Sequence, residues 1–240
     1  MKKKWILLKI LLLLIGLTLL VAFSQNRYDI REVKEVKTKI DYSHGNHFIT
    51  HQMVDSLLKK THPDYPEMGM KRVYIKDMEY ILNQDNFISH ANVYLENDGV
   101  LYAEITQEIP VLRVHNKKNE YYISQFGKQI PLSPHFSARV LLAEGDIEAQ
   151  EHKGLVELVQ RINDDNLLKN LVIGIRKEKL NSFILLIDDE DYFLELGKLE
   201  ELAIKLENFK VFYHKYISKT KEIPYKKLNL KFTNQIIAIK

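Results

Sequence analysis

Apolar and polar residues follow three patterns along this chain, and each pattern predicts a different kind of element. The first is a long apolar run from Trp5 to Phe23, interrupted only by Lys9 and Thr18. As a helix this run is roughly 28 Å long, close to the ~30 Å hydrocarbon core of a bilayer. Lys9 lies one turn inside the run and can extend its ammonium group back to the head groups. We therefore predict a transmembrane helix at residues 5–23.

The residues that flank the run set its orientation. Three lysines precede it in a tail at residues 1–4, which the positive-inside rule places in the cytoplasm. The body of the protein is then expected outside the cytoplasm, after a polar linker at residues 24–29. A cleaved signal peptide is the alternative, because Ala22-Phe23-Ser24 satisfies a small-x-small cleavage pattern. Both alternatives export the body.

Residues 30–115 combine the helical and the strand pattern, and we predict one small domain there. A strand at Ile30–Ile40 precedes two amphipathic helices, and two strands then flank Asn97-Asp98-Gly99. Asp-Gly favours a type I′ turn, because both central positions of that turn need positive φ. Strand, helix, helix, strand, strand is a complete order for two helices on one face of a three-stranded sheet. The helical apolar positions are Ile49, Met53, Val54, Leu57 and Leu58, then Ile75, Met78, Ile81 and Leu82.

A second, strand-rich domain is predicted at residues 120–240, after the polar stretch His115–Glu120 (HNKKNE). It begins with a strand, a turn at Gly127 and another strand, and it contains a helix that Asp164-Asp165-Asn166 interrupts. A long helix follows within residues 198–219. Its narrow apolar stripe favours packing on a sheet over a coiled coil. The stripe consists of Leu199, Leu202, Leu206, Phe209, Tyr213 and Tyr216.

The chain ends in a predicted strand that starts at Lys227. Leu228, Leu230 and Phe232 alternate with polar residues, which is the period-2 pattern of a strand with one buried face. After Phe232 the pattern loosens, and isoleucines fall on both faces. The fold class is therefore predicted as α+β: a transmembrane helix, a β-α-α-β-β module, and a mixed α/β domain that ends in an edge strand.

Composition and charge exclude several classes of function. The chain has no cysteine, which excludes a disulfide scaffold, a thiol nucleophile and a zinc–cysteine cluster. The four lysines before Phe23 more than account for the net charge of +3, so the rest of the chain is nearly neutral. We therefore predict no nucleic-acid partner. The glycines are scattered and form neither a phosphate-binding loop nor a nucleophile elbow. We predict no enzyme activity, no cofactor and no small-molecule substrate.

Two clusters are candidates for metal ligands. His47 and His51 would share a helical face near His44, but they lack the adjacent glutamate of a zincin motif. Asp188–Asp191 (DDED) lacks the wider spacing and the glycine of a calcium-binding loop. We interpret both clusters as solvated turn and helix residues and predict no metal site.

Three stretches of the chain resemble the FtsQ/DivIB family of bacterial division proteins. Ile105–Val114 (ITQEIPVLRV) is similar to the last strand of that family's POTRA module, and Tyr121–Leu141 is similar to the start of its β domain. Tyr225–Lys240 is similar to its final strand, especially at Asn229–Phe232 and Asn234-Gln235. The resemblance implies a single-pass, non-enzymatic scaffold in the inner membrane at the division septum, with its body in the periplasm.

The same resemblance implies a partner and a binding surface. The family's β domain binds FtsB, which pairs with FtsL, along the edge of its last strand and the adjoining helix. A partner strand would cover that edge by β-augmentation. Phe232 stands where the family often has tyrosine, and Glu108 stands where it often has a basic residue, so this chain lacks that hydroxyl group and that basic side chain. The implied partner-binding residues are Asn229, Lys231, Phe232, Asn234 and Gln235, with Phe212, Tyr213 and Tyr216 on the helix.

Three other functions fit the residues less well. A different POTRA-type assembly protein or chaperone would share the module order, but its usual companion is a membrane barrel, for which this chain has no room. A secreted binding protein would follow from a cleaved signal peptide. An exported hydrolase would need a nucleophile or metal cluster that the sequence does not show.

Overall fold

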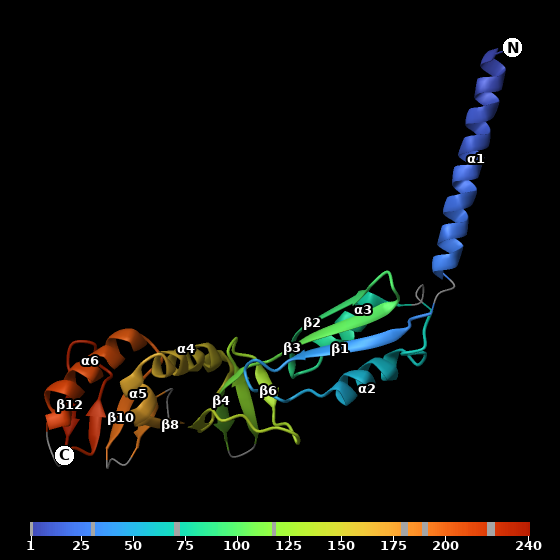
Figure 1. Cartoon of the computed structure of the whole chain (residues 1–240). Coiled ribbons are helices and arrows are strands. Elements are labelled where there is room, and N and C mark those ends of the chain that lie inside the picture. Colours follow the sequence, from blue (N-terminus) through green and yellow to red (C-terminus); the bar gives the residue numbers. More distant parts are fainter. Residues whose placement is uncertain are drawn as a thin grey trace. The chain divides into compact units, whose positions relative to one another are not determined.

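The computed structural model describes residues 2–29, 32–69, 73–116, 119–178, 182–188, 192–219 and 224–240 (Figure 1). The chain divides into two compact units, Met1–Gln107 and Glu108–Lys240.

The N-terminal element is a single helix, α1 (Lys2–Asp29), drawn in blue in Figure 1. It contains the apolar run, and the apolar side chains described there, Trp5 and Phe23 included, are exposed. The predicted linker at residues 24–29 is wrong, because these polar residues are compatible with a helix and continue it without a break. Among the residues that the structure describes, no helix combines the length and the apolar character needed to cross a membrane.

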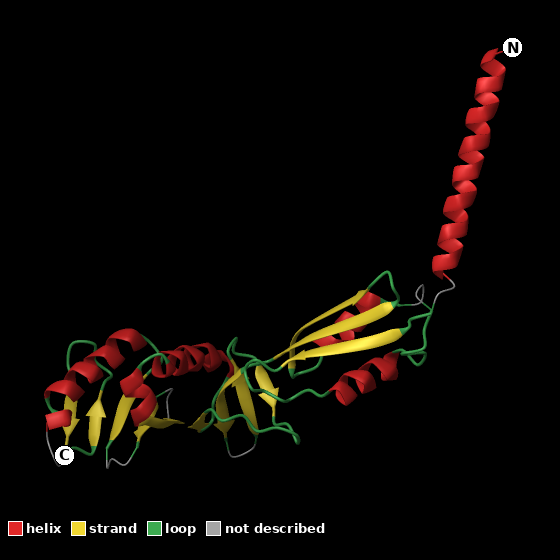
Figure 2. Ribbon diagram, in the orientation of Figure 1, coloured by secondary structure: helices red, strands yellow, loops and turns green. Residues whose placement is uncertain are grey.

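The remainder of the first unit has the predicted β-α-α-β-β order (Figure 2). Its sheet has the order β1-β3-β2, with β1 parallel and β2 antiparallel to β3. The first strand starts at Glu35 rather than at Ile30, which lies outside the described residues. The elements are β1 (Glu35–Asp41), α2 (His51–Thr61), α3 (Ile75–Asn83), β2 (Ile88–Leu95) and β3 (Val100–Gln107).

The core of this unit lies between the sheet and the two helices. Val54 and Leu58 of α2 and Met78 and Leu82 of α3 are fully buried, as the amphipathic pattern predicts. The hairpin between β2 and β3 forms where expected, but its turn is different. Of its residues only Gly99 has a positive φ, 92°, so the loop needs one left-handed position instead of the two of a type I′ turn.

The second unit is built on a nine-stranded sheet with the order β12-β11-β10-β9-β8-β7-β4-β5-β6. Its strands are β4 (Pro110–His115), β5 (Glu120–Ser124), β6 (Gln129–Pro131), β7 (Leu141–Glu144), β8 (Val172–Lys177), β9 (Phe183–Ile187), β10 (Phe193–Gly197), β11 (Lys227–Asn229) and β12 (Ile237–Ile239). Its helices are η2 (Ala149–Glu151), α4 (His152–Asn163), α5 (Asn166–Leu171), α6 (Leu202–Lys215) and η3 (Ile217–Lys219).

The boundary between the units differs from the predicted one at His115. β4 belongs to the second sheet, where it pairs with β5 and β7, so the boundary lies after Gln107. His115 is paired directly with Glu120. The stretch HNKKNE is therefore the turn of a hairpin within the second unit rather than an interdomain linker; its residues 117–118 lie outside the described residues.

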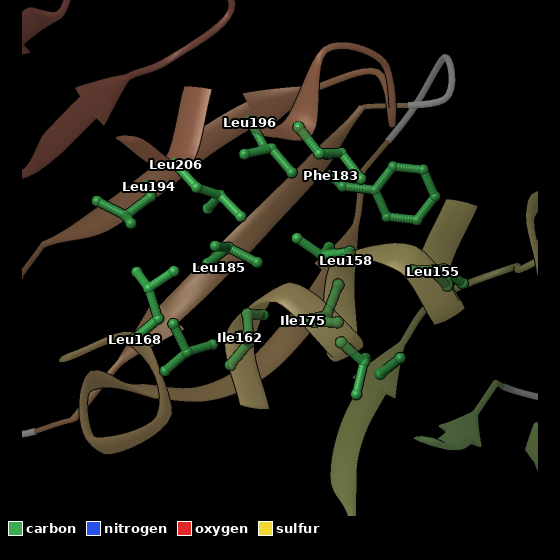
Figure 3. Packing of buried hydrophobic residues seen from close by; sticks show 14 of the residues in the cluster. Leu155, Leu158, Ile162, Leu168, Ile175, Phe183, Leu185, Leu194, Leu196 and Leu206 are labelled. Carbon is green, nitrogen blue, oxygen red and sulfur yellow. The ribbon is translucent and has the colours of Figure 1, made fainter. Parts of the chain in front are cut away.

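Helices α4, α5 and α6 pack on one face of the large sheet. Cross-strand pairing aligns one buried side chain from each of six adjacent strands, and this row forms the sheet side of the core. Figure 3 shows Leu158 of α4, Leu168 of α5 and Leu206 of α6 among the side chains of this core. The row consists of Val114, Ala143, Ile175, Leu185, Leu194 and Leu228.

Two of the three local features predicted for this unit are confirmed, and the third differs. The interruption at 164–166 is confirmed, because α4 ends at Asn163 and Asp165 caps α5 by accepting the N–H groups of Leu167 and Leu168. The turn at Gly127 is confirmed by its φ of 83°. The long helix is shorter than expected, since α6 begins only at Leu202.

Candidate functional site

The C-terminal segment is a hairpin and not the predicted single edge strand. β11 is paired on both sides, in parallel with β10 and antiparallel with β12. It ends because Asn229 Oδ1 accepts the backbone N–H of Lys231 at 3.0 Å, a local turn that competes with strand pairing. Among the described residues β12 pairs with β11 alone, so β12 is the edge of the sheet.

The start of the connection between β11 and β12 is held by Glu195 of β10. The backbone carbonyl of Glu195 accepts the N–H of Leu230 at 2.8 Å. Its carboxylate lies 2.6 Å from Lys231 Nζ and 3.2 Å from Lys227 Nζ. Burial of this carboxyl group opposes its ionisation, but the two ammonium groups prevail and hold the pKa of Glu195 below its usual value. Glu195 therefore fixes the register at which β11 ends.

We expect Glu195→Gln to lower the free energy of unfolding at pH 7 by about 1–3 kcal/mol, because two ammonium groups lose their charged acceptor. The pKa of Glu195 is lowered in the folded state. The carboxylate thus contributes stability above its unfolded pKa of about 4.3, and the contribution is lost as pH falls through the folded pKa. Urea unfolding followed by circular dichroism measures this at pH 7 and near pH 3. An equal difference between wild type and variant at both pH values would contradict the role of the charge.

The far side of the connection is attached to α6. Asn208 Nδ2 donates to the carbonyl oxygen of Thr233 at 2.7 Å. An aromatic cluster lies along the same helix: the ring centroids of Phe212 and Tyr216 are 5.0 Å apart, and those of Phe212 and Tyr225 are 6.3 Å apart. These contacts join helix α6 to the C-terminal segment, and both lie at the orange-to-red end of the chain in Figure 1.

Phe232 lies on the surface of the molecule. Its side chain is 49% exposed, whereas Leu228 and Leu230 are 0% and 1% exposed. Strict alternation would have buried the ring beside Leu230, but the strand ends at Asn229 and the chain turns before Phe232 is reached. Phe232 is therefore available to a partner and is not part of the core.

The other predicted partner-binding residues fall into two groups. Lys231, Asn234 and Gln235 are exposed in or beside the connection, while Asn229 is half-buried inside the sheet and is not an edge residue. On the helix side, Tyr216 is 57% exposed, and Phe212 and Tyr213 are half-buried against the core. The hydrogen bond between Asn208 and Thr233 attaches the connection, which carries the first group, to α6.

Sequence reasoning missed the strand that forms the edge. Ile237 and Ile239 are 39% and 41% exposed. They are paired with Asn229 and Lys227, on the face away from the helices, while Ala238 pairs with buried Leu228. The sequence does show apolar residues on both faces after Phe232. We had interpreted them as a continuation of the strand that starts at Lys227 and not as a separate strand.

The free edge of β12 is centred on the backbone of Ala238. In β11 the carbonyl of Lys226 accepts from Phe193 N, and Leu230 N donates to β10, so these groups face β10. Backbone groups alternate in direction along a strand. The N–H and C=O groups of Lys227 and Asn229 therefore face β12, where these residues pair with Ile239 and Ile237. The N–H and C=O of Ala238 consequently point to the open side.

The candidate metal clusters gain no support. Across the described ranges, no group of three or more histidine, aspartate and glutamate residues is placed to hold a metal ion. The ring of His47 stacks on Tyr42 with a centroid distance of 4.7 Å. Of the DDED stretch, residues 189–191 lie outside the described residues. Glu108, which stands where the family often has a basic residue, is buried and forms an ion pair with Lys128 Nζ at 3.1 Å. Its carboxylate therefore has a partner within the chain.

Comparison with known families assigns each unit to a class. Residues 31–106 match the POTRA-like domain, and residues 109–239 match the family described as FtsQ/DivIB, C-terminal related. The second match covers more than half of the chain. The chain belongs to the FtsQ/DivIB family of bacterial cell-division proteins. Both matched ranges agree with the unit boundary after Gln107.

One similar solved structure is the major extracytoplasmic domain of the trans isomer of the cell-division protein DivIB from Geobacillus stearothermophilus. It shares 11% sequence identity, with 48% of this chain and 98% of that chain covered, at a TM-score of 0.34. The curated proteins include no match to the sequence.

Proposed function

We propose that this chain is a non-enzymatic scaffold of the bacterial division machinery that binds an FtsB/FtsL-type pair through β12 and the aromatic side of α6. Membership in the FtsQ/DivIB family supports the role in division. The observation that carries the binding site is the edge of β12, which no other described strand covers and where the N–H and C=O of Ala238 point outward. A partner strand would satisfy these groups by main-chain hydrogen bonds and take its specificity from neighbouring side chains.

The two edges of the large sheet differ in a way that favours β12. The opposite edge, β6, ends in Pro131, and a proline on an edge strand obstructs the addition of another strand. β12 has no proline, and its outward face carries the exposed side chains of Ile237 and Ile239. Phe232 and Tyr216 add exposed aromatic rings nearby, which suit the anchor positions of an interface.

We further propose that the chain is anchored in the cytoplasmic membrane, with both units outside the cytoplasm at the division septum. The support is the apolar run from Trp5 to Phe23 and the lysines of residues 2–4 before it. With this topology α1 would place the POTRA-like domain next to the membrane, and the second unit with β12 would lie on the periplasmic side.

Depletion of the protein in its native cell tests the role in division. We expect filaments with unfinished septa, seen by membrane staining, and recovery when the full chain is expressed again. Cells that form normal septa at normal frequency after depletion would contradict a division function.

A further inference from the structure

The C-terminal end of the second unit carries a concentration of positive charge. Residues 208–240 include eight lysines and one glutamate, with neither arginine nor aspartate, whereas residues 24–207 contain more acidic than basic side chains. A surface with charge of one sign attracts partners of the opposite sign and raises their association rate. The near-neutral sum of the whole body conceals this asymmetry.

Only some of these lysines are neutralised within the chain. Lys210 lies 2.9 Å from Asp165 and 2.6 Å from Glu207, and two other lysines share the carboxylate of Glu195. Four more have exposed side chains and form no ion pair with a carboxylate in the part of the chain that the structure describes: Lys215, Lys219, Lys226 and Lys240.

Two of these lysines lie at one end of the terminal hairpin, and the other two lie at and after the C-terminal end of α6. The backbone N–H of Lys226 donates to the carbonyl of Ile239 at 2.8 Å, which holds Lys226 and Lys240 at the same end of the terminal hairpin. Tyr225 precedes Lys226, and its ring contacts that of Phe212 on α6, which also packs on Tyr216 directly after the helix. Lys215 and Lys219 lie on either side of Tyr216 in the sequence. We refer to these lysines and aromatic residues as the lysine–aromatic surface.

We propose that the lysine–aromatic surface binds an acidic polypeptide segment, and that this segment adjoins the strand which pairs with β12. This inference rests on the proposed function, because it takes the edge of β12 as the starting point. The positive charge selects an anionic ligand. The adjacent unpaired strand edge selects a polypeptide over a lipid head group or free phosphate, since only a polypeptide can form main-chain hydrogen bonds with it.

The lysines and the aromatic rings of this surface are expected to contribute to binding in different ways. Exposed ammonium groups at the rim of an interface act mainly on the association rate and on its salt dependence. The aromatic rings can cover the aliphatic part of acidic side chains once the carboxylates pair with the lysines. The segment is therefore expected to carry glutamate or aspartate close to the end of its strand, at the side where Lys226 and Lys240 lie.

The test uses the purified full chain in a neutral detergent and the FtsB–FtsL pair of the same organism as probe. We expect the double variant Lys226→Gln/Lys240→Gln to bind the pair about tenfold more weakly at about 50 mM NaCl, chiefly through slower association. The difference should disappear at about 500 mM NaCl, where exposed charges are screened. Lys153→Gln/Lys169→Gln, on exposed positions of α4 and α5, is the matched control and should bind like wild type.

Three outcomes would overturn the inference in distinguishable ways. If the double variant binds the pair as wild type does, the lysines have no part in binding, while the proposed function stands. If the wild-type chain does not bind the pair, the proposed function and this inference fail together. If soluble dihexanoyl phosphatidylglycerol displaces the pair as effectively as poly-L-glutamate, the surface recognises anionic lipid and the assignment to a polypeptide is wrong.

Discussion

Ala238→Pro is expected to weaken binding of the FtsB–FtsL pair roughly tenfold or more while leaving the second unit folded. The substitution removes the N–H that points to the free edge of β12, and the proline ring obstructs the close approach of a partner strand. One lost main-chain hydrogen bond costs about 0.5–1.5 kcal/mol, and about 1.4 kcal/mol corresponds to a tenfold change in affinity. The fold should tolerate the change, because proline is accepted on edge strands where the N–H faces solvent.

The matched control for this prediction is Ala238→Gly, which keeps the N–H and should bind within about twofold of wild type. Affinity can be measured by biolayer interferometry on the full chain in detergent, and the melting temperature of each variant by circular dichroism. A folded Ala238→Pro protein with wild-type affinity would remove the edge of β12 from the binding site.

Gln107→Leu is expected to destabilise the first unit by at least about 4 kcal/mol. The buried side-chain amide of Gln107 connects β3 to the loop before α2 through four hydrogen bonds. Its Oε1 accepts the N–H groups of Phe48 and Ile49 at 2.8 and 3.0 Å, and its Nε2 donates to the carbonyls of Asp41 and Asn46 at 2.9 and 2.8 Å. Leucine would leave four backbone groups without this partner, and each buried unsatisfied group costs about 1–3 kcal/mol.

Two further variants sharpen this prediction. Gln107→Glu keeps an acceptor for the two N–H groups but places a carboxylate oxygen against two carbonyl oxygens, so it too should destabilise the unit at pH 7. Gln52→Leu, at an exposed position of α2, should change the free energy of unfolding by no more than about 0.5 kcal/mol. Urea unfolding provides the comparison, and a cost below about 1 kcal/mol for Gln107→Leu would show that the amide is not the clamp we describe.

The elements that sequence reasoning found are those long enough to show their period. β2 and β3 each span eight residues, and a glycine marks the turn between them, so alternation and turn chemistry both pointed to a hairpin. β11 and β12 span three residues each, which is too short for a period of two to be distinguished from chance. The Asn229 side chain that ends β11 is recognisable only once its bond to Lys231 is seen.

The unit boundary was misplaced for a related reason. β3 ends at Gln107 and β4 begins at Pro110, so two strands of different sheets follow one another almost directly, with no change in composition between them. Only the pairing of β4 with β5 and β7 shows that it belongs to the second unit. The four hydrogen bonds of the Gln107 side chain could not be predicted from the sequence either, because its partners lie in residues 41–49 and only the fold brings them close.

Amide hydrogen exchange at β12, with and without the FtsB–FtsL pair, tests the proposed binding mode most directly. We predict that the N–H of Ala238, which points to the open side of the sheet, exchanges rapidly in the chain alone. When the pair is bound, its exchange should slow by about a hundredfold or more, as expected for an N–H drawn into a hydrogen-bonded ladder. The β6 edge at Gln129–Pro131 should be unaffected. Unchanged exchange at Ala238 in a chain that has bound the pair would contradict strand addition at β12.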